Sequence, residues 1–374
     1  MNTPGIRIPG QSNGSSGIDS SKSEANDSFI IAPEDRILIT GATGFIGSRV
    51  VAELLARGFR NLICLARPSS DLARIEAVVK AQPLGAQVEV LKGNLLSDSD
   101  CEAACRDVAV IYHLAAGTGG KSFPDAFMNS VVTTRNLLDA SVRQSSLRRL
   151  VLVSSFAVYS NRQKSRTLDE SSAIEDHPEF RDAYCYAKVK QEELVKQYSK
   201  LLGGRYVIVR PGAVYGAGRD GINGRIGLGT FGLFLHLGGS NKVPFTYVDN
   251  CASAIVLGGI VKGIDGEVFN VSDDDLPTSR QFLKEYKRHV KGFPSVFVPH
   301  ALCYGLCYLW EKYSQCSAGQ LPPAFNRSHW YALWRPTRYS NAHLKRTLGW
   351  APRVSTTEAL RRYFTACRQN KGYA

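Results

Sequence analysis

The sequence predicts an α/β fold built on a doubly wound parallel sheet, and two observations lead to this prediction. Along the first two thirds of the chain, short apolar runs alternate with segments of helical spacing, as the strands and crossover helices of a parallel sheet do. The first apolar run, residues 37–39, is followed by a glycine-rich turn and by a helical segment over residues 50–56. Strand, glycine turn and helix together form the first unit of a Rossmann-type, dinucleotide-binding fold.

The turn after the first strand carries three glycines at intervals of three residues, namely Gly41, Gly44 and Gly47. The first permits a tight turn, the second lets the backbone approach a pyrophosphate, and the third lets the helix pack close to the strand. The helix N-terminus adds free N–H groups and a positive dipole end that favour phosphate. The spacing differs from the common G-x-G-x-x-G, so on these residues alone an ordinary turn stays an alternative.

The end of the second predicted strand, residues 61–67, bears on the choice of cofactor. An NAD site usually has an acidic residue here for the ribose 2′-hydroxyl, but the first acid is Asp71, beyond the turn. Arg67 is placed to meet a 2′-phosphate instead, with Ser69 and Ser70 as further donors. The sequence therefore favours NADP over NAD. The alternative is that Arg67 is a solvated strand-end residue and that either cofactor binds.

The third, fourth and fifth strands are predicted over residues 87–91, 108–114 and 150–154. Small residues at the carboxyl end of a strand let a flat ring lie against the backbone, as a ligand crevice in a parallel sheet requires. His113, near the end of the fourth strand, is interpreted as a packed residue rather than a catalyst. The residues after these strands that we assign to cofactor binding are Asn94, Leu95, Leu114, Ala115 and Ala116.

A serine, a tyrosine and a lysine follow the fifth strand with a spacing that suits proton transfer. Ser155 comes at the end of the strand, and Tyr184 and Lys188 are one turn apart on a predicted helix. A lysine ammonium stabilises tyrosinate and lowers the pKa of the phenol, which brings the tyrosine nearer the working pH of an acid/base catalyst. Tyr186 and Lys190 form an overlapping pair of the same spacing, so the pattern alone does not choose between them.

With these motifs the chain resembles the extended short-chain dehydrogenases/reductases, the family of nucleotide-sugar epimerases and 3β-hydroxysteroid dehydrogenases. Residues 40–47 resemble the glycine motif of that family and residues 207–216 its sixth-strand motif. The family pattern of Tyr, three residues, Lys, three residues, Glu matches Tyr184, Lys188 and Glu192, which resolves the choice of tyrosine. The resemblance runs from about residue 36 to 365 and implies further cofactor contacts by Thr43, Phe45, Ile46, Pro211 and Val214.

Several positions depart from the family pattern or discriminate within it. Asn94 stands where the family usually has an Asp that contacts the adenine, and Ser160 replaces a Gly. Ser130 stands where an Asn is expected, which removes support for a proton relay through that position. Phe156 and Ala157 occupy the positions where family members that dehydrate nucleotide sugars carry acidic residues. We therefore do not expect a 4,6-dehydratase.

The chain is predicted to divide into a tail, a cofactor domain and a substrate domain. Residues 1–34 are rich in Ser, Gly and Asn and predict a disordered tail. Residues 35–215 form the predicted Rossmann domain, to which residues 247–272 return. Residues 216–246 and 273–374 form the predicted, smaller substrate-binding domain.

Two segments of the predicted substrate domain have distinctive composition. Residues 216–239 hold nine glycines and are expected to form a mobile loop over the site, in which Arg219 and Arg225 either grip phosphate or lie in solvent. Residues 296–310 are apolar, but Pro299 and His300 interrupt a run that would need about 20 residues to span a bilayer. We interpret this segment as a buried or substrate-covering helix, with membrane-surface contact as the alternative.

Charge and cysteine content exclude some classes of function. The net charge is +13, but lysines and arginines are interleaved with acidic residues, so no nucleic-acid interface is predicted. The nine cysteines are scattered without CxxC pairs, which predicts reduced thiols and a cytoplasmic location. Cys101 with Cys105 and Cys303 with Cys307 lack further ligands nearby. We interpret them as core residues, so no metal site is predicted.

The predicted function is NAD(P)-dependent hydride transfer at a hydroxyl or keto carbon. The family resemblance implies that Tyr184 exchanges the hydroxyl proton, Ser155 orients the substrate oxygen and Lys188 also holds the nicotinamide ribose. The first expectation is an epimerase of a nucleotide sugar, and the alternative is a 3β-hydroxysteroid dehydrogenase-like enzyme or ketone reductase of an apolar substrate. A non-enzymatic NADP-sensing scaffold is disfavoured because all three residues are present. The expected partners are a small-molecule substrate and, by family analogy, a second copy in a homodimer.

Overall fold

The computed structural model describes residues 28–81, 87–117, 122–161, 165–230, 232–316 and 326–370. Its centre is a seven-stranded sheet in which every neighbouring pair is parallel, in the order β12-β7-β5-β4-β1-β2-β3. The predicted doubly wound parallel sheet is confirmed. Its strands are β1 (Ile37–Thr40), β2 (Asn61–Ala66), β3 (Gln87–Lys92), β4 (Val110–His113), β5 (Arg149–Val153), β7 (Tyr206–Pro211) and β12 (Val268–Val271).

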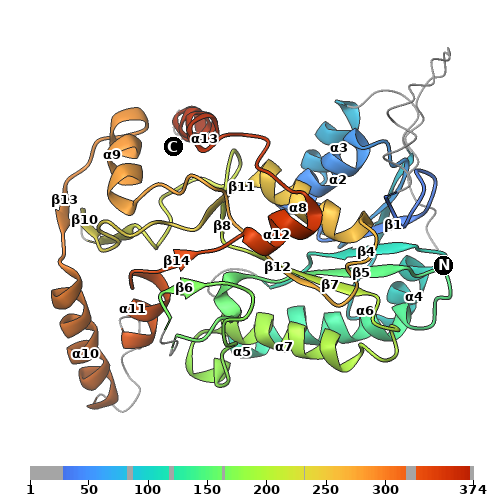
Figure 1. The fold of residues 1–374 in the computed structure, drawn as a ribbon, viewed down its shortest axis with the longest axis horizontal. Coiled ribbons are helices and arrows are strands. Elements are labelled where there is room, and N and C mark those ends of the chain that lie inside the picture. Colours follow the sequence, from blue (N-terminus) through green and yellow to red (C-terminus); the bar gives the residue numbers. More distant parts are fainter. Residues whose placement is uncertain are drawn as a thin grey trace.

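Helices cover both faces of this sheet (Figure 1). The alternation along β1 explains the two layers, because successive side chains of a strand point to opposite faces. Ile37 and Ile39 pack into one apolar cluster, and Leu38 packs into the other. The first cluster is completed by α2 (Gly47–Ala56), α3 (Ala73–Lys80) and α8 (Val248–Ile260), and the second by α4 (Asp98–Cys105), α6 (Thr133–Ser141) and α7 (Ala183–Gln197).

The strand order places the ligand edge of the sheet. The chain proceeds from β1 outwards to β2 and β3, then crosses back to β4, β5 and β7 on the other side of β1. The direction of winding therefore reverses between β1 and β4. In open parallel sheets, ligands bind outside the carboxyl ends of the strands at such a reversal.

The smaller half of the molecule lies beyond the carboxyl edge of the sheet and contains short strands and helices (Figure 1). Three strands from distant segments form one small sheet, in the order β13-β10-β9. Two further pairs, β8 with β11 and β6 with β14, connect this half to the main sheet. The strands are β6 (Thr167–Leu168), β8 (Ala213–Tyr215), β9 (Gly227–Thr230), β10 (Leu233–His236), β11 (Phe245–Tyr247), β13 (Ser295–Phe297) and β14 (Arg338–Tyr339).

The remaining helices fall into three groups. A short α5 (Phe123–Ala126) runs through a π-helical turn, Phe127–Val132, into α6. α9 (Ser279–His289), α10 (His300–Cys316) and α11 (Arg327–Leu333) belong to the smaller half. After them, α12 (Ala342–Leu348) and α13 (Thr356–Asn370) contribute side chains to the first apolar cluster of the main body.

The prediction that residues 216–239 form a loop is wrong for their second half. β9 and β10 make an antiparallel hairpin there, and β10 pairs in parallel with β13. The high glycine content suggested a loop rather than strands. β10 is a strand because it pairs with β13, about sixty residues later in the chain. The pairing is a tertiary effect that local composition does not carry.

The expected tail and the expected apolar helix also differ from the structure in part. Residues 1–27 of the tail lie outside the described residues. Phe29 forms a bridge with Val261, and Ile31 is buried, so the folded part of the chain begins before residue 34. The apolar segment 296–310 is divided between β13 and α10.

The interpretation of that segment as a buried helix is wrong for its leucines. In α10 the buried residues are Cys303, Cys307 and Ser314, whereas Leu302, Leu306 and Leu309 are exposed. Of the helices in the part of the chain that the structure describes, none has the length and apolarity needed to cross a bilayer.

Candidate active site

The glycine turn after β1 has the geometry that a phosphate-binding turn needs. Gly41 has a φ of 71°, and a Cβ there would lie 2.9 Å from the backbone nitrogen of Ala115. A Cβ on Gly47 would collide with the carbonyl oxygen of Gly41, so only glycine lets α2 begin this close to the turn. Among the described residues, a Cβ on Gly44 would approach only that same oxygen, at 3.1 Å. The outer side of Gly44 is therefore open to a ligand.

The N-terminus of α2 offers donors to such a ligand. The helix has no capping side chain and no acidic residue in its first turn. Within the described ranges, the backbone N–H groups of Phe45 and Ile46 have no hydrogen-bond acceptor. Together with the positive end of the helix dipole, they suit a pyrophosphate. Thr43, in the same turn, is half-buried. These residues fit the dinucleotide that the sequence predicts.

The carboxyl ends of β2, β3 and β4 carry the other predicted cofactor residues. Arg67 is exposed after β2, while the nearby Asp71 uses its carboxylate to accept the N–H of Ala73, at 2.9 Å. Asn94 accepts the N–H of Leu96 through its side-chain oxygen, at 3.0 Å. Leu95 is buried, and Leu114, Ala115 and Ala116 are half-buried after β4.

Ser155 and Tyr184 are brought together by the end of β5 and the first turn of α7. Ser155 caps a short 3-10 turn, Phe156–Val158, and its Oγ accepts the N–H of Ala157 at 3.2 Å. Asp182 caps α7 by accepting the N–H of Cys185 at 2.9 Å. Tyr184 lies close enough to Ser155 for the serine hydroxyl to lower the pKa of the phenol, and both residues line the same cleft. The structure thus places the predicted phenol and alcohol side by side.

Burial raises the pKa of the Tyr184 hydroxyl, and the neighbouring Ser155 hydroxyl and the positive charge of Arg219 oppose that rise. The negative charge of Asp182 adds to it. The residue still exposes 37% of its surface, so the ring borders solvent-accessible space. At neutral pH the phenol is protonated and can donate its proton.

Lys188 lies one turn after Tyr184 but is directed towards the sheet. Its Nζ donates to the carbonyl oxygen of Val153 at 2.7 Å. Burial lowers the pKa of Lys188 to about 8, and the charge of Glu192 opposes this. Among the positive charges around Tyr184, that of Arg219 lowers the pKa of the phenol. The lowering by Lys188 stays a prediction.

His113 is a packed residue, as the sequence predicts. Its Nδ1 is 2.8 Å from Oγ1 of Thr40, and its Nε2 is 2.8 Å from Oγ1 of Thr134. Burial lowers the pKa of His113 to about 3, and the nearby Lys188 contributes. The ring is therefore neutral and already bonded on both sides, which leaves no nitrogen for the substrate.

Glu192 completes the family pattern on α7 through a buried network behind the site. It forms a bidentate ion pair with Arg210, at 2.8 and 2.6 Å, and accepts the hydroxyl of Ser154 at 2.6 Å. Each side chain of the pair exposes 2% of its surface. Arg210 also donates to the hydroxyl of Tyr159 at 3.0 Å, and that hydroxyl donates to Asn270 at 2.6 Å. The network ties α7 to β7 and β12, so it fixes the helix that carries Tyr184 and Lys188.

A cleft of about 380 Å³ runs between the carboxyl edge of the main sheet and the smaller half. From the predicted site residues it gathers Ile46, Ser155, Tyr184, Pro211 and Val214. Lys188 is buried behind the cleft. The remaining predicted cofactor residues lie on the glycine turn and at the ends of β2, β3 and β4, outside this cleft.

The opposite wall of the cleft contains residues that sequence reasoning missed. They include Tyr331, Arg335 and Tyr339 from α11 and the segment after it. Tyr339 stacks on Phe156 with ring centroids 5.7 Å apart and an interplanar angle of 10°. These residues follow Tyr184 by about 150 positions in a segment without a recognisable motif, so no local signal marks them.

The two loop arginines have different environments. Arg219 lies in the cleft and acts electrostatically on Tyr184. Arg225 is half-buried and donates to the carbonyl oxygen of Ala332 at 2.9 Å and to the hydroxyl of Tyr339 at 3.3 Å. Of the two predicted roles, a solvated charge does not describe Arg225, and phosphate binding by this cleft residue stays a prediction. Arg225 joins the glycine-rich segment to α11 and β14.

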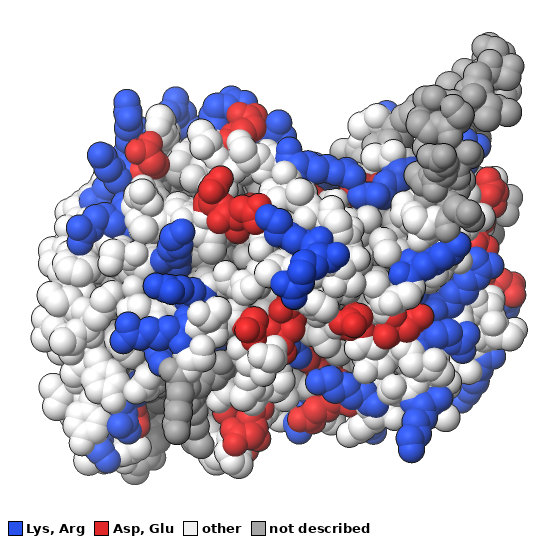
Figure 2. All heavy atoms as spheres, viewed as in Figure 1, with Lys and Arg blue, Asp and Glu red and all other residues white. Residues whose placement is uncertain are grey.

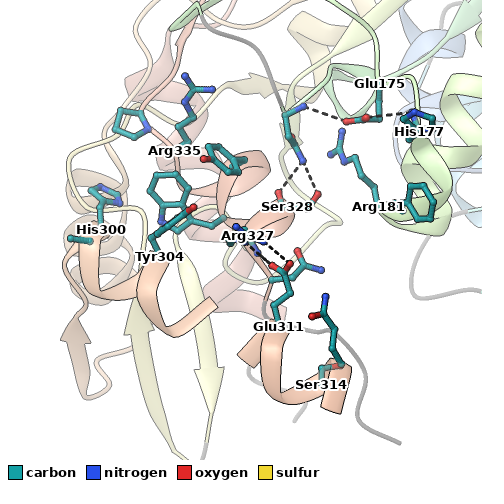
Figure 3. Close-up of a pocket in the computed structure, with 18 residues that line it drawn as sticks. Glu175, His177, Arg181, His300, Tyr304, Glu311, Ser314, Arg327, Ser328 and Arg335 are labelled. Atoms are coloured by element: carbon teal, nitrogen blue, oxygen red, sulfur yellow. Dashed lines mark hydrogen bonds and ion pairs between the residues drawn. The ribbon is translucent and has the colours of Figure 1, made fainter. Parts of the chain in front are cut away.

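A second, larger pocket of about 1350 Å³ adjoins the cleft and shares Asn161, Arg181, Tyr331 and Arg335 with it. Figure 3 shows α10 on one side of this pocket, and Glu175, His177 and Arg181 on the other. Asn161 donates to the backbone and hydroxyl oxygens of Ser328 at 2.9 and 3.0 Å.

Its walls combine one ion pair with several aromatic rings. Arg327 donates to both carboxylate oxygens of Glu311, at 3.0 and 2.9 Å (Figure 3). Tyr304 and Trp330 pack edge to face with centroids 5.1 Å apart. Phe180 and Tyr331 line the pocket as well. An apolar body of substantial size would find contact surface here.

Cysteines are core residues at the positions that the sequence singled out. Cys101, Cys105, Cys303 and Cys307 are all buried. Within the described ranges, no group of three or more His, Cys, Asp or Glu side chains has an arrangement that could hold a metal ion.

Comparison with known proteins agrees with these features. The model of the NAD dependent epimerase/dehydratase family matches residues 37–272. The chain is 27% identical over 376 residues to short-chain dehydrogenase/reductase family 42E member 1 of Mus musculus, covering 91% of this chain and 90% of the relative. It is 30% identical over 200 residues to a 3 beta-hydroxysteroid dehydrogenase/Delta 5-->4-isomerase of Mycobacterium tuberculosis, covering 51% of this chain and 50% of the relative.

Among solved structures, the fold is similar to that of a UDP-glucuronic acid 4-epimerase from Bacillus cereus in complex with UDP-glucuronic acid and NAD. The TM-score is 0.67 at 20% identity, covering 90% of this chain and 99% of that one. The family match extends over more than half of the 374 residues and includes both the glycine turn and the Ser155–Tyr184 pair. This chain therefore belongs to the NAD dependent epimerase/dehydratase family.

Proposed function

We propose that this chain is an NAD(P)-dependent oxidoreductase that acts at a hydroxyl or keto carbon of an apolar substrate. The observation that carries the proposal is that Ser155 and Tyr184 lie side by side in one cleft, which adjoins a pocket with several aromatic side chains. When bound, a nicotinamide supplies the hydride acceptor or donor that no side chain provides. The residues of this chain handle the proton and position the substrate.

Tyr184 is the proposed proton donor and acceptor. Because burial raises its pKa, the phenol is protonated at neutral pH and suits proton donation to a ketone oxygen. Ser155, beside the same hydroxyl, orients the substrate oxygen. Lys188 uses one of its three N–H donors on Val153, which leaves two donors for ribose hydroxyls.

The choice of an apolar substrate has two supports. One terminal nitrogen of Arg225 in the cleft is already bonded to Ala332 and Tyr339, which reduces the donors that it can offer to a nucleotide diphosphate. The larger pocket offers aromatic surface instead. The relative named as a 3 beta-hydroxysteroid dehydrogenase acts, by that name, on a hydroxyl of an apolar ring system. These points reverse the order of the two substrate hypotheses drawn from the sequence.

Epimerisation of a nucleotide sugar remains the second candidate, because Arg219 lies in the cleft beside Tyr184. A substrate panel distinguishes the two. Net accumulation of reduced or oxidised cofactor with hydroxysteroids or apolar ketones supports the first candidate. Conversion of a UDP-hexose without net change in cofactor supports the second. Turnover with neither class would leave the cofactor-sensing scaffold as the explanation.

Replacing the proposed catalytic phenol tests the assignment directly. Tyr184→Phe should lower kcat by about 10²- to 10⁴-fold, the usual contribution of a general acid, while cofactor binding measured by fluorescence is retained. Tyr186→Phe is the matched control, since Tyr186 has the same spacing to Lys190 and should keep its activity. Near-normal turnover of Tyr184→Phe would refute the proposed role.

We propose NADP as the preferred cofactor, on the exposed Arg67 and the engaged carboxylate of Asp71. Arg67→Asp should weaken NADP binding about 10- to 100-fold, the value of a charge-assisted contact, and leave NAD binding unchanged or improved. Arg60→Asp, at the opposite end of β2 and also exposed, is the control. Equal effects of Arg67→Asp on both cofactors, in titrations followed by fluorescence, would contradict the proposed 2′-phosphate contact.

A further inference from the structure

One face of α10 is apolar and exposed. The residues on it follow the spacing 4, 3, 4, which places them on a single side of a helix. They are Leu302, Leu306, Leu309 and Tyr313, and each exposes between 51% and 63% of its surface. The other side of α10 carries the buried Cys303, Cys307 and Ser314. The outer face therefore has no partner within the described part of the chain.

The strand before the helix adds two exposed apolar side chains, which lie on its opposite faces. Val296 and Phe297 of β13 are exposed too, and β13 and α10 follow each other along one edge of the smaller half (Figure 1). A soluble protein usually scatters such side chains singly, so a contiguous group marks a surface that contacts something apolar.

Cations border this surface on the side of α9. The guanidinium of Arg280 lies 5.4 Å from the ring centre of Phe297. Lys284, Arg288 and Lys291 are exposed on or just after the same helix. Figure 2 shows the resulting pattern: the left edge, where Figure 1 places β13 and α10, is largely free of charge, and Lys and Arg gather above it.

We propose that this surface, formed by the exposed face of α10 with β13 and bordered by the cations of α9, docks on an anionic lipid bilayer. The apolar side chains enter the acyl boundary, and the cations reach the phosphate and carboxylate groups of the lipids. The contact is with the membrane surface, because α10 has 17 residues and also carries Glu311 and Lys312. The inference does not depend on the reaction that the enzyme performs.

A bilayer fits these observations better than a second copy of the chain. A two-helix seam would cover α10 but would leave β13 outside the contact. In a symmetric pair the same patch meets itself, and the side chains that define this patch include no acid to neutralise the cations around Arg280. An anionic surface neutralises those charges, and the net charge of +13 favours the same approach.

Docking would also position the larger pocket. The inner side of α10 supplies His300, Tyr304 and Ser314 to that pocket (Figure 3). The helix therefore separates the pocket from the proposed lipid contact by the thickness of one helix, about 10 Å.

Vesicle co-sedimentation of the full chain tests the proposal. We expect binding to vesicles of phosphatidylcholine with phosphatidylserine and little binding to phosphatidylcholine alone. Leu306→Gln with Leu309→Gln should lower the partition coefficient at least about tenfold. Leu201→Gln is the matched control, since Leu201 is equally exposed, at 65%, but lies after α7.

The cations are tested separately. Lys284→Gln with Arg288→Gln should lower partitioning roughly fivefold per charge. The control is Lys80→Gln with Lys200→Gln, which removes two exposed charges from the sheet half.

A second measurement avoids dependence on a variant that fails to fold. Trp310 lies on α10 beside the apolar face, so brominated lipids should quench wild-type fluorescence when anionic vesicles are added. Absence of both sedimentation and quenching overturns the proposal, as does unchanged binding of the double leucine variant. A dimer in light scattering that this variant converts to monomer, without vesicle binding by the wild type, would assign the face to a second copy and also overturn it.

Discussion

The two halves of the molecule differ in how much of each element is buried. In the sheet half, β1 and β5 are buried at every position, and the helices on both faces bury apolar stripes. In the smaller half, α10 buries three of its 17 residues, and α11, which is described throughout, buries none. The sheet half is therefore a continuous packed core, whereas α10 and α11 of the smaller half are thin elements around two pockets.

This difference predicts where substitutions are costly. A substitution in the sheet half that changes the charge or volume of a buried side chain cannot be accommodated by small shifts of its neighbours, because protein interiors are packed as densely as organic crystals. The same change in the smaller half meets solvent or pocket space. Three experiments measure this contrast, and the expected effects decrease in the order given.

The largest effect is expected at the buried Glu192–Arg210 pair. Glu192→Gln keeps the size of the side chain but leaves the charge of Arg210 without its counter-ion, which should cost about 3–5 kcal/mol of unfolding free energy. Urea denaturation measures it. The control is Glu311→Gln at the partly exposed pair with Arg327 in the smaller half, which should cost about 1 kcal/mol or less. Similar losses in both variants would break the comparison.

A smaller effect is expected from adding one methyl group at a glycine. Gly47→Ala collides with the carbonyl of Gly41, so it should cost about 1–3 kcal/mol and weaken cofactor binding. Gly224→Ala in the smaller half meets no described atom within 4 Å and should change stability by less than about 0.5 kcal/mol. Thermal melting with and without NADP separates the two. A Gly47→Ala variant that binds NADP normally would remove the role given to this turn.

The smallest effect is expected from an interaction between the two halves, that of Arg219 in the glycine-rich segment with Tyr184 on α7. The charge of Arg219 lowers the pKa of Tyr184, so Arg219→Gln should raise that pKa further. Oxidation of an alcohol needs the tyrosinate, which then forms only at higher pH. The alkaline rise of kcat/KM for oxidation should therefore move to higher pH. Arg225→Gln is the control, because the Arg225 guanidinium is bonded to Ala332 and Tyr339. It should leave the profile in place, and a shift there would contradict the assignment.

The sequence predicts the sheet half well because its signals are local. Short apolar runs mark β1 to β5, and the glycine spacing around Gly44 marks the turn between β1 and α2. The position of Tyr184 and Lys188 on one helix follows from their spacing and is confirmed by α7. The direction of the Lys188 side chain could not be predicted, because it depends on the carbonyl of Val153 in a neighbouring strand.

The smaller half is predicted poorly because its contacts join distant segments. β10 needs β13, and Thr167 of β6 pairs with Arg338 of β14. The contact of Arg225 with Ala332 spans 107 positions. In the β10–β13 pair, for example, one strand lies in the glycine-rich segment 216–239 and the other begins the apolar segment 296–310. Composition alone does not show that these two segments pair. Its loop prediction and its buried-helix interpretation failed for this reason.

The position of β12 at the edge of the main sheet has a consequence for synthesis on the ribosome. β1 to β5 are complete once residue 153 has emerged, but β12 ends at residue 271 and pairs with β7 only then. The chain leaves the ribosome N-terminus first, at about 5–20 residues per second. A nascent chain therefore carries its glycine turn and Tyr184 well before Asn270 arrives to accept the Tyr159 hydroxyl, and the buried network behind α7 is completed last.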